Sequence, residues 1–213
     1  MLDVLLKPIT SPVAFFRTLK DDDRVVSRAF IVVLLVALLG AVSAYFAALP
    51  LADATRGTLL ALAFNPFFSA LATVGALFLI WLVYGLLVRM SAGMEAKPWA
   101  VTAYGMAPQL IISAVLIIVS AFFPATLTPV TGDLTDPPLV AEASRNLTAE
   151  LQASFAGRVS TILSYASSLW WLVLIFIGVR ETAGQQKAIR ATVIVGLVTL
   201  AFLVVPFLLS PVG

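Results

Sequence analysis

The chain has 213 residues, of which 61 % are hydrophobic and 11 % charged, and its mean hydropathy of +1.06 excludes an ordinary water-soluble globular domain. It contains no cysteine and no histidine, which removes disulfides, thiolate nucleophiles, imidazole bases and the usual ligands of zinc, haem and iron–sulfur clusters, so we expect no metal site and no cofactor. The formal net charge of +2 comes from dispersed Lys and Arg residues, and a nucleic-acid partner is therefore not expected.

Residues 1–28 precede the first long apolar stretch, and we expect this N-terminal segment to lie in the cytoplasm. Ser11 and Pro12 have the positions of an N-cap and a first helical residue, and they predict a short helix that runs to about residue 20. One side of this helix is expected to be apolar, with Val13, Phe16 and Leu19. Such a helix fits the interface of the cytoplasmic leaflet, with packing against the membrane helices as an equal alternative.

Five apolar stretches have the roughly 20 residues that a helix needs to cross the hydrocarbon core of a bilayer. They are 29–50, 67–88, 99–123, 162–179 and 188–209. Because backbone groups in lipid must be satisfied within a segment, these stretches predict helices. We therefore expect an all-α integral membrane bundle of five helices, with residues 29–213 forming a single transmembrane domain.

The connections between the predicted spans differ in positive charge, and cationic connections tend to remain in the cytoplasm. Five Lys and Arg residues precede the first span, two lie between the second and third, and three lie around the connection after the fourth. The opposite side has Arg56, Arg145 and Arg158. This asymmetry predicts a cytoplasmic N-terminus, an extracytoplasmic C-terminus and an odd number of spans.

The third predicted span contains the most polar side chain deep in any span, Gln109, directly after Pro108. The proline predicts a kink, because it removes a backbone donor from the helix. Gln109 is expected to hydrogen-bond to neighbouring helices, and the alternative is that it lines a polar pathway.

The connection between the third and fourth spans, residues 124–160, has two halves of different composition. Residues 126–138 have the Pro, Thr, Gly and Asp content of an irregular loop. From residue 139 onward apolar residues recur every four positions, which indicates a helix outside the membrane. Whether residues 139–160 are continuous with the fourth span stays open at this point.

Three sequence features together resemble the Yip1-domain family of membrane proteins. The first is the element with Pro12, Phe15, Phe16 and Leu19 ahead of the first span. The second is YGMAPQL at residues 104–110, and the third is SLWWLVLIFIGVRETAGQQKA at residues 168–188. With five spans and a cytoplasmic N-terminus, the resemblance covers nearly the whole chain.

The resemblance implies a membrane-embedded protein whose eukaryotic relatives are associated with vesicle trafficking and contact small GTPases. Those relatives carry a cytoplasmic extension, whereas 28 residues precede the first predicted span here, so small GTPase contact is not expected. The alanine- and valine-rich composition indicates a bacterial inner (cell) membrane protein.

These observations favour a non-enzymatic scaffold or membrane-organising protein, with a trafficking-like role, that contacts lipid and either further copies of itself or other membrane proteins. The alternative is a transporter, channel or lipid-moving protein for a neutral or lipid substrate. An enzyme is not expected, and no catalytic residue is assigned, because Ser164 and Ser168 have no base placed to activate them. The candidate functional or packing residues are Tyr104, Pro108, Gln109, Trp170, Trp171 and Arg180.

Overall fold

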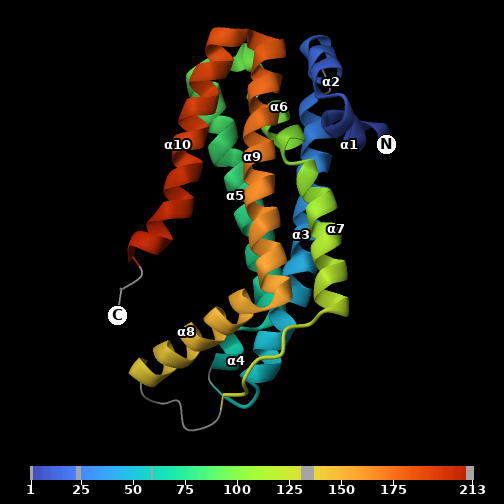
Figure 1. The fold of residues 1–213 in the computed structure, drawn as a ribbon. Coiled ribbons are helices and arrows are strands. Elements are labelled where there is room, and N and C mark those ends of the chain that lie inside the picture. Colours follow the sequence, from blue (N-terminus) through green and yellow to red (C-terminus); the bar gives the residue numbers. More distant parts are fainter. Residues whose placement is uncertain (1, 23–24, 59, 131–136, 210–213) are drawn as a thin grey trace. The chain divides into compact units, whose positions relative to one another are not determined.

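The computed structural model describes the backbone of residues 2–22, 25–58, 60–130 and 137–209, and the side chains of the same residues except 2–5, 21 and 202–209. Every described element is helical, which confirms the predicted all-α class of a membrane helical protein (Figure 1). The elements are α1 (Leu2–Thr10), α2 (Pro12–Thr18), η1 (Leu19–Asp21), α3 (Val25–Ala54), α4 (Leu60–Ala63), α5 (Pro66–Ala92), η2 (Met94–Ala96), α6 (Pro98–Gly105), α7 (Pro108–Phe122), α8 (Pro137–Ala153), α9 (Phe155–Ala183) and α10 (Gln185–Leu209).

Four helical stretches of the described residues are long and apolar enough to cross a membrane, judged by length and composition. They are Val25–Ala54, Leu60–Ala92, Met94–Phe122 and Phe155–Ala183. They cover the first four predicted spans, except that the third stretch ends at Phe122, one residue before the predicted end. The fifth predicted span, 188–209, falls within α10, but the side chains of its last eight residues lie outside the described part of the chain. Five spans therefore remain a prediction.

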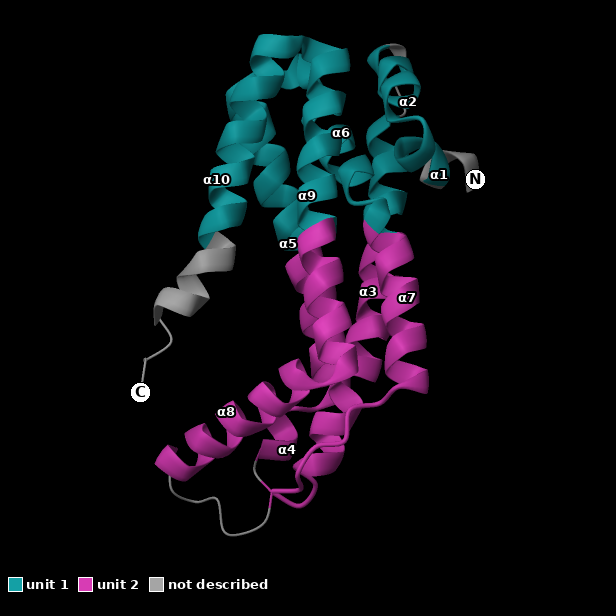
Figure 2. Cartoon of the chain, viewed as in Figure 1, with its two compact units in different colours: residues 1–34, 78–108, 167–213 teal, residues 35–77, 109–166 magenta. Residues whose placement is uncertain are grey.

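The chain forms two compact units, and α3, α5 and α9 each contribute residues to both (Figure 2). Unit 1 contains residues 1–34, 78–108 and 167–213, and unit 2 contains residues 35–77 and 109–166. Unit 1 thus holds the N-terminal segment, the α5–α6 connection and the α9–α10 connection, the three regions whose positive charge predicts the cytoplasmic side.

The third predicted span is interrupted where Pro108 predicts a kink, because α6 ends at Gly105 and α7 begins at Pro108. In the turn between them, Met106 N–H donates to the carbonyl of Ala103 and Ala107 N–H to that of Tyr104, each three residues back. The Thr102 carbonyl, which a continuous helix would pair with Met106, instead accepts the indole N–H of Trp171 from α9 at 3.2 Å.

Glycine at position 105 lets the Trp171 ring lie directly on the backbone of α6. A Cβ atom at Gly105 would lie 2.4 Å from Trp171 Cδ1, a distance that side chains do not tolerate. The other side of the indole stacks on Tyr84 of α5, with ring centroids 4.6 Å apart and planes at 29°. Tyr84 O–H donates to Thr199 Oγ1 of α10 at 2.7 Å, since the Thr199 hydroxyl itself donates to Val195. Trp171 therefore joins α9 to α5 and α6, and Tyr84 extends the connection to α10.

In unit 2 the predicted extracytoplasmic helix is present as α8, but it is separate from α9. Ser154 stands between them, and its hydroxyl oxygen accepts the backbone N–H of Gly157 at 3.1 Å, which caps the first turn of α9. A Cβ atom at Gly157 would lie 2.1 Å from the Leu151 carbonyl oxygen, so the close approach of the two helix ends requires glycine. Figure 2 shows α8 leaving the first turns of α9 at a steep angle.

The contact between Trp171 and Gly105 predicts that Gly105→Ala destabilises the protein by about 1–3 kcal/mol, because the added methyl group displaces an indole fixed by a hydrogen bond and a stacked ring. Thermal unfolding of the purified protein in detergent should show a decrease in Tm of about 5 °C.

Gly75→Ala is the matched control, because nothing lies within 4 Å of a Cβ atom built at Gly75 and alanine favours the helix. Its Tm should equal or exceed that of the unmodified chain. Equal Tm values for the two variants would contradict the contact between the Trp171 ring and the backbone of α6 at Gly105.

Candidate functional site

Helix α2 packs on the other helices of unit 1 through two adjacent phenylalanines. The Phe16 side chain is 0 % exposed, and a Cβ atom at Gly178 of α9 would lie 3.1 Å from its Cδ1 atom and 2.7 Å from Val101 Cγ1 of α6. Phe15 places its ring edge against Tyr104 of α6, with centroids 4.7 Å apart and planes at 76°. The sequence allows two alternatives for the N-terminal helix, the membrane interface and packing against the membrane helices. Its aromatic side thus packs against the membrane helices.

The sequence explains why α2 forms and where it ends. Pro12 occupies the first helical turn after Ser11, as the sequence predicts, although the Ser11 side chain makes no capping hydrogen bond. Leu19, which follows in η1, is 3 % exposed, so it is buried on the same side as Phe16. Val13 is exposed, so the apolar side of the predicted helix is only partly covered by unit 1.

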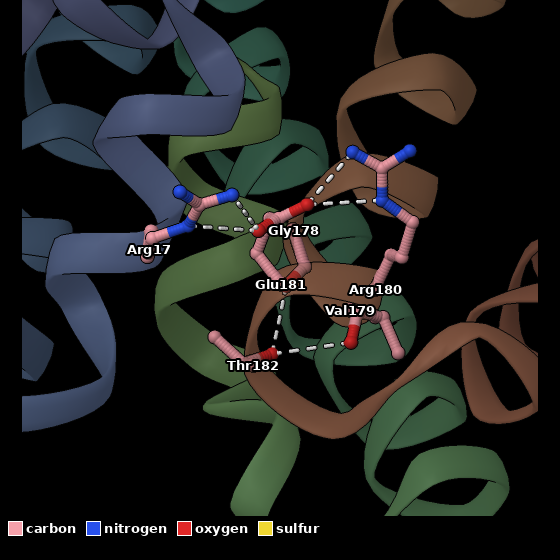
Figure 3. A network of polar contacts seen from close by, with 6 residues as sticks. All are labelled: Arg17, Gly178, Val179, Arg180, Glu181 and Thr182. Carbon is pink, nitrogen blue, oxygen red and sulfur yellow. Dashed lines mark hydrogen bonds and ion pairs between the residues drawn. The ribbon is translucent and has the colours of Figure 1, made fainter.

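Glu181, near the end of α9, accepts hydrogen bonds from two arginines (Figure 3). Arg17 of α2 donates through Nε and Nη2 to Oε2 at 3.3 and 3.2 Å, and Arg180 donates through the same two atoms to Oε1 at 3.0 and 2.7 Å. Each guanidinium presents its fork to one carboxylate oxygen, which fixes the orientation of the pair. The Arg17 side chain is 71 % exposed and that of Glu181 12 %, so solvent weakens this ion pair and Phe16 is the stronger anchor of α2.

The two connections at this end of unit 1 are also bonded to each other. The Thr182 hydroxyl lies 2.7 Å from the Gly178 carbonyl oxygen of its own helix and 3.2 Å from that of Ala96 in η2. Glu95 in η2 forms an ion pair with Lys187 of α10. These contacts hold the α5–α6 connection beside the turn between α9 and α10.

The structure distributes the six candidate residues over both units. Tyr104, Pro108, Trp171 and Arg180 belong to unit 1, where Tyr104 is 1 % exposed beneath Phe15 and Trp171 bonds to the Thr102 carbonyl. Trp170 is in unit 1 as well, but its side chain is exposed. Gln109 is half-buried in unit 2 and lines a cavity there. Five of the six candidates thus belong to unit 1 and one to unit 2.

Sequence reasoning missed Glu181 and Gly178 as partners of α2. The one sequence feature that points to Glu181 is its position directly after Arg180 in a polar turn. Its pairing with Arg17, 164 positions earlier, depends on tertiary structure and cannot be read from the sequence. Across the described residues, no three His, Cys, Asp or Glu side chains lie close enough together to hold a metal ion. The arrangement around Glu181 holds two helices together.

Phe16→Ala should release α2 from unit 1, because it removes a fully buried aromatic side chain, a change that costs about 3 kcal/mol in protein cores. Limited trypsin digestion in detergent should then cleave after the exposed Lys20 about tenfold faster or more.

Two variants of the same helix serve as controls. Val13→Ala changes an exposed side chain and should leave the cleavage rate unchanged, and Arg17→Gln should raise it only slightly. If Phe16→Ala and Val13→Ala are cleaved at the same rate, α2 is not anchored by Phe16.

Comparison with known proteins places these segments in a family. The family model of the Yip1 domain matches residues 6–209, which include α2, the break between α6 and α7, and the α9–α10 turn. No curated protein and no solved structure matches the chain. Since the match covers nearly the whole sequence, the chain belongs to the Yip1-domain family of membrane proteins.

Proposed function

We propose that this Yip1-domain protein is a non-enzymatic membrane-organising protein that acts through contacts with lipid and with other membrane proteins, including further copies of itself. Its N-terminus is assigned to the cytoplasm and its C-terminus to the extracytoplasmic side, on the basis of the positive charges of the connections. Alanine and valine enrichment supports a bacterial inner membrane.

The observation that carries this proposal is an apolar stripe on the outer side of α10. It consists of Ile189, Val193, Leu197 and Leu200, all of which are exposed. Their spacing of four, four and three residues places them on one side of the helix. The opposite side, with Ala188, Ala191, Val195 and Thr199, is buried within unit 1. A helix that is apolar on both sides requires lipid or another helix against its outer side.

The charged groups of unit 1 support the same proposal. Glu181 is bonded to Arg17 and Arg180, and Glu95 is bonded to Lys187. These acids therefore contribute to holding helices and connections in place. The apolar outer sides of the helices are the surfaces that we propose for contact with partners.

Movement of a neutral or lipid substrate is the second candidate function. It is supported by the cavity in unit 2 that Gln109 and several hydroxyl side chains line. A ligand of that cavity does not depend on any partner protein.

A photo-activatable benzoylphenylalanine placed at Val193 or Leu197 should form discrete protein adducts in intact cells, because the α10 stripe is the proposed contact surface. Denaturing gels and mass spectrometry identify these adducts. Leu79 on α5 of unit 1 is the matched control, since it is equally exposed but lies outside the stripe.

The proposal expects protein adducts at the two α10 positions and lipid adducts at Leu79. Lipid adducts alone at all three positions would contradict the proposed contact surface.

A further inference from the structure

Unit 2 contains a cavity of about 520 Å³, a size typical of small-molecule sites and far above the ~15 Å³ that one water requires. Residues of α3, α5, α7 and α9, with the end of α8, line it. All of its lining residues are uncharged. The polar ones are Ser43, Thr73, Gln109, Ser113, Ser120, Gln152, Ser160, Thr161 and Ser164.

Two of the cavity's serines are deeply buried, with Ser113 of α7 1 % exposed and Ser43 of α3 7 % exposed. Among the described residues neither hydroxyl has a hydrogen-bond partner, and neither oxygen atom is fully enclosed, unlike Thr192 Oγ1, which is both enclosed and without a partner. In contrast, Thr73 and Thr161 donate to carbonyl oxygens of their own helices at 2.8 and 3.0 Å. Both serines lie within predicted spans, where a polar group without a partner is costly. Their hydroxyls therefore offer two hydrogen bonds to a bound molecule.

The remaining walls are apolar, with Phe46 and Leu77 among the large side chains and Leu116 on α7. An ionised ligand is disfavoured, because no lining residue carries a charge to pair with it. A molecule that suits both kinds of wall has uncharged oxygen atoms at one end and hydrocarbon at the other. Amphipathic molecules of this kind partition into a bilayer, in which these helices are expected to lie.

We propose that the unit 2 cavity binds a neutral lipid with a single acyl chain, such as a monoacylglycerol. The hydroxyl and ester oxygens of the lipid pair with Ser43 and Ser113, and its chain packs against the apolar wall. This site goes beyond the proposed organising function, because its residues belong to unit 2 whereas the α10 stripe belongs to unit 1, and because it requires no partner protein.

The test uses the full chain purified in detergent and a monoacylglycerol whose acyl chain carries a diazirine and an alkyne. After illumination, mass spectrometry locates the labelled peptides. Unlabelled monoacylglycerol and lysophosphatidic acid with the same acyl chain serve as neutral and anionic competitors.

Labelling is expected in the cavity-lining parts of α3, α5, α7 and α9, and the neutral competitor should suppress it at about tenfold lower concentration than the anionic one. The double variant Ser43→Ala/Ser113→Ala should raise the half-saturating concentration about tenfold, as expected for two lost hydrogen bonds. Ser113→Ala alone should shift it in the same direction by a smaller factor.

Ser91→Ala is the matched control, because Ser91 is also 7 % exposed but belongs to unit 1 and donates to the Leu87 carbonyl at 2.7 Å. It should bind the probe like the unmodified chain. Labelling spread evenly over lipid-facing peptides, equal suppression by the two competitors, or unchanged binding by the double variant would each overturn the proposal. None of these outcomes affects adduct formation at Val193, so the two proposals fail separately.

Discussion

The packing of unit 1 depends on the contact between an indole ring and a helix backbone that lacks a Cβ atom. At Gly105 the Trp171 ring occupies the space of a side chain. The indole N–H donates to the Thr102 carbonyl, which has lost its usual helical donor because the helix is interrupted before Pro108. In lipid, where apolar burial adds little to helix association, close backbone approach and interhelical hydrogen bonds supply much of the stabilisation. The Trp171 side chain provides both the close approach and the interhelical hydrogen bond, and it thereby joins α9 to α6.

The same principle operates where α2 joins unit 1. Phe16 of α2 and Val101 of α6 both lie against Gly178, and the charges of Arg17 and Glu181 orient the helix at the rim of that contact. The N-terminal segment is thereby part of the folded unit. Under the proposed organising function, a partner bound at α2 would act on a segment already coupled to the membrane helices. The outer stripe of α10 and the unit 2 cavity provide two further surfaces of different chemistry.

Local features of the sequence predict the helices and the break at Pro108, because hydropathy and a missing backbone donor act within a few residues. Pairings such as Trp171 with Thr102 and Phe16 with Gly178 were not predicted. The long helices are apolar on every side, so periodicity does not show which side faces another helix. The separation of α8 from α9 at Ser154 and the cavity behind Ser113 likewise depend on tertiary packing.

The most direct test of this account is solid-state NMR of the protein in bilayers, with ¹⁵N in the tryptophan indoles and ¹³C in the threonine carbonyls. The account predicts dipolar dephasing between Trp171 and Thr102, as expected for an indole nitrogen 3.2 Å from a carbonyl oxygen, and loss of this dephasing in Trp171→Phe. Absence of dephasing in the unmodified chain, or the same dephasing in Trp171→Phe, would show that the indole does not hold α9 on α6.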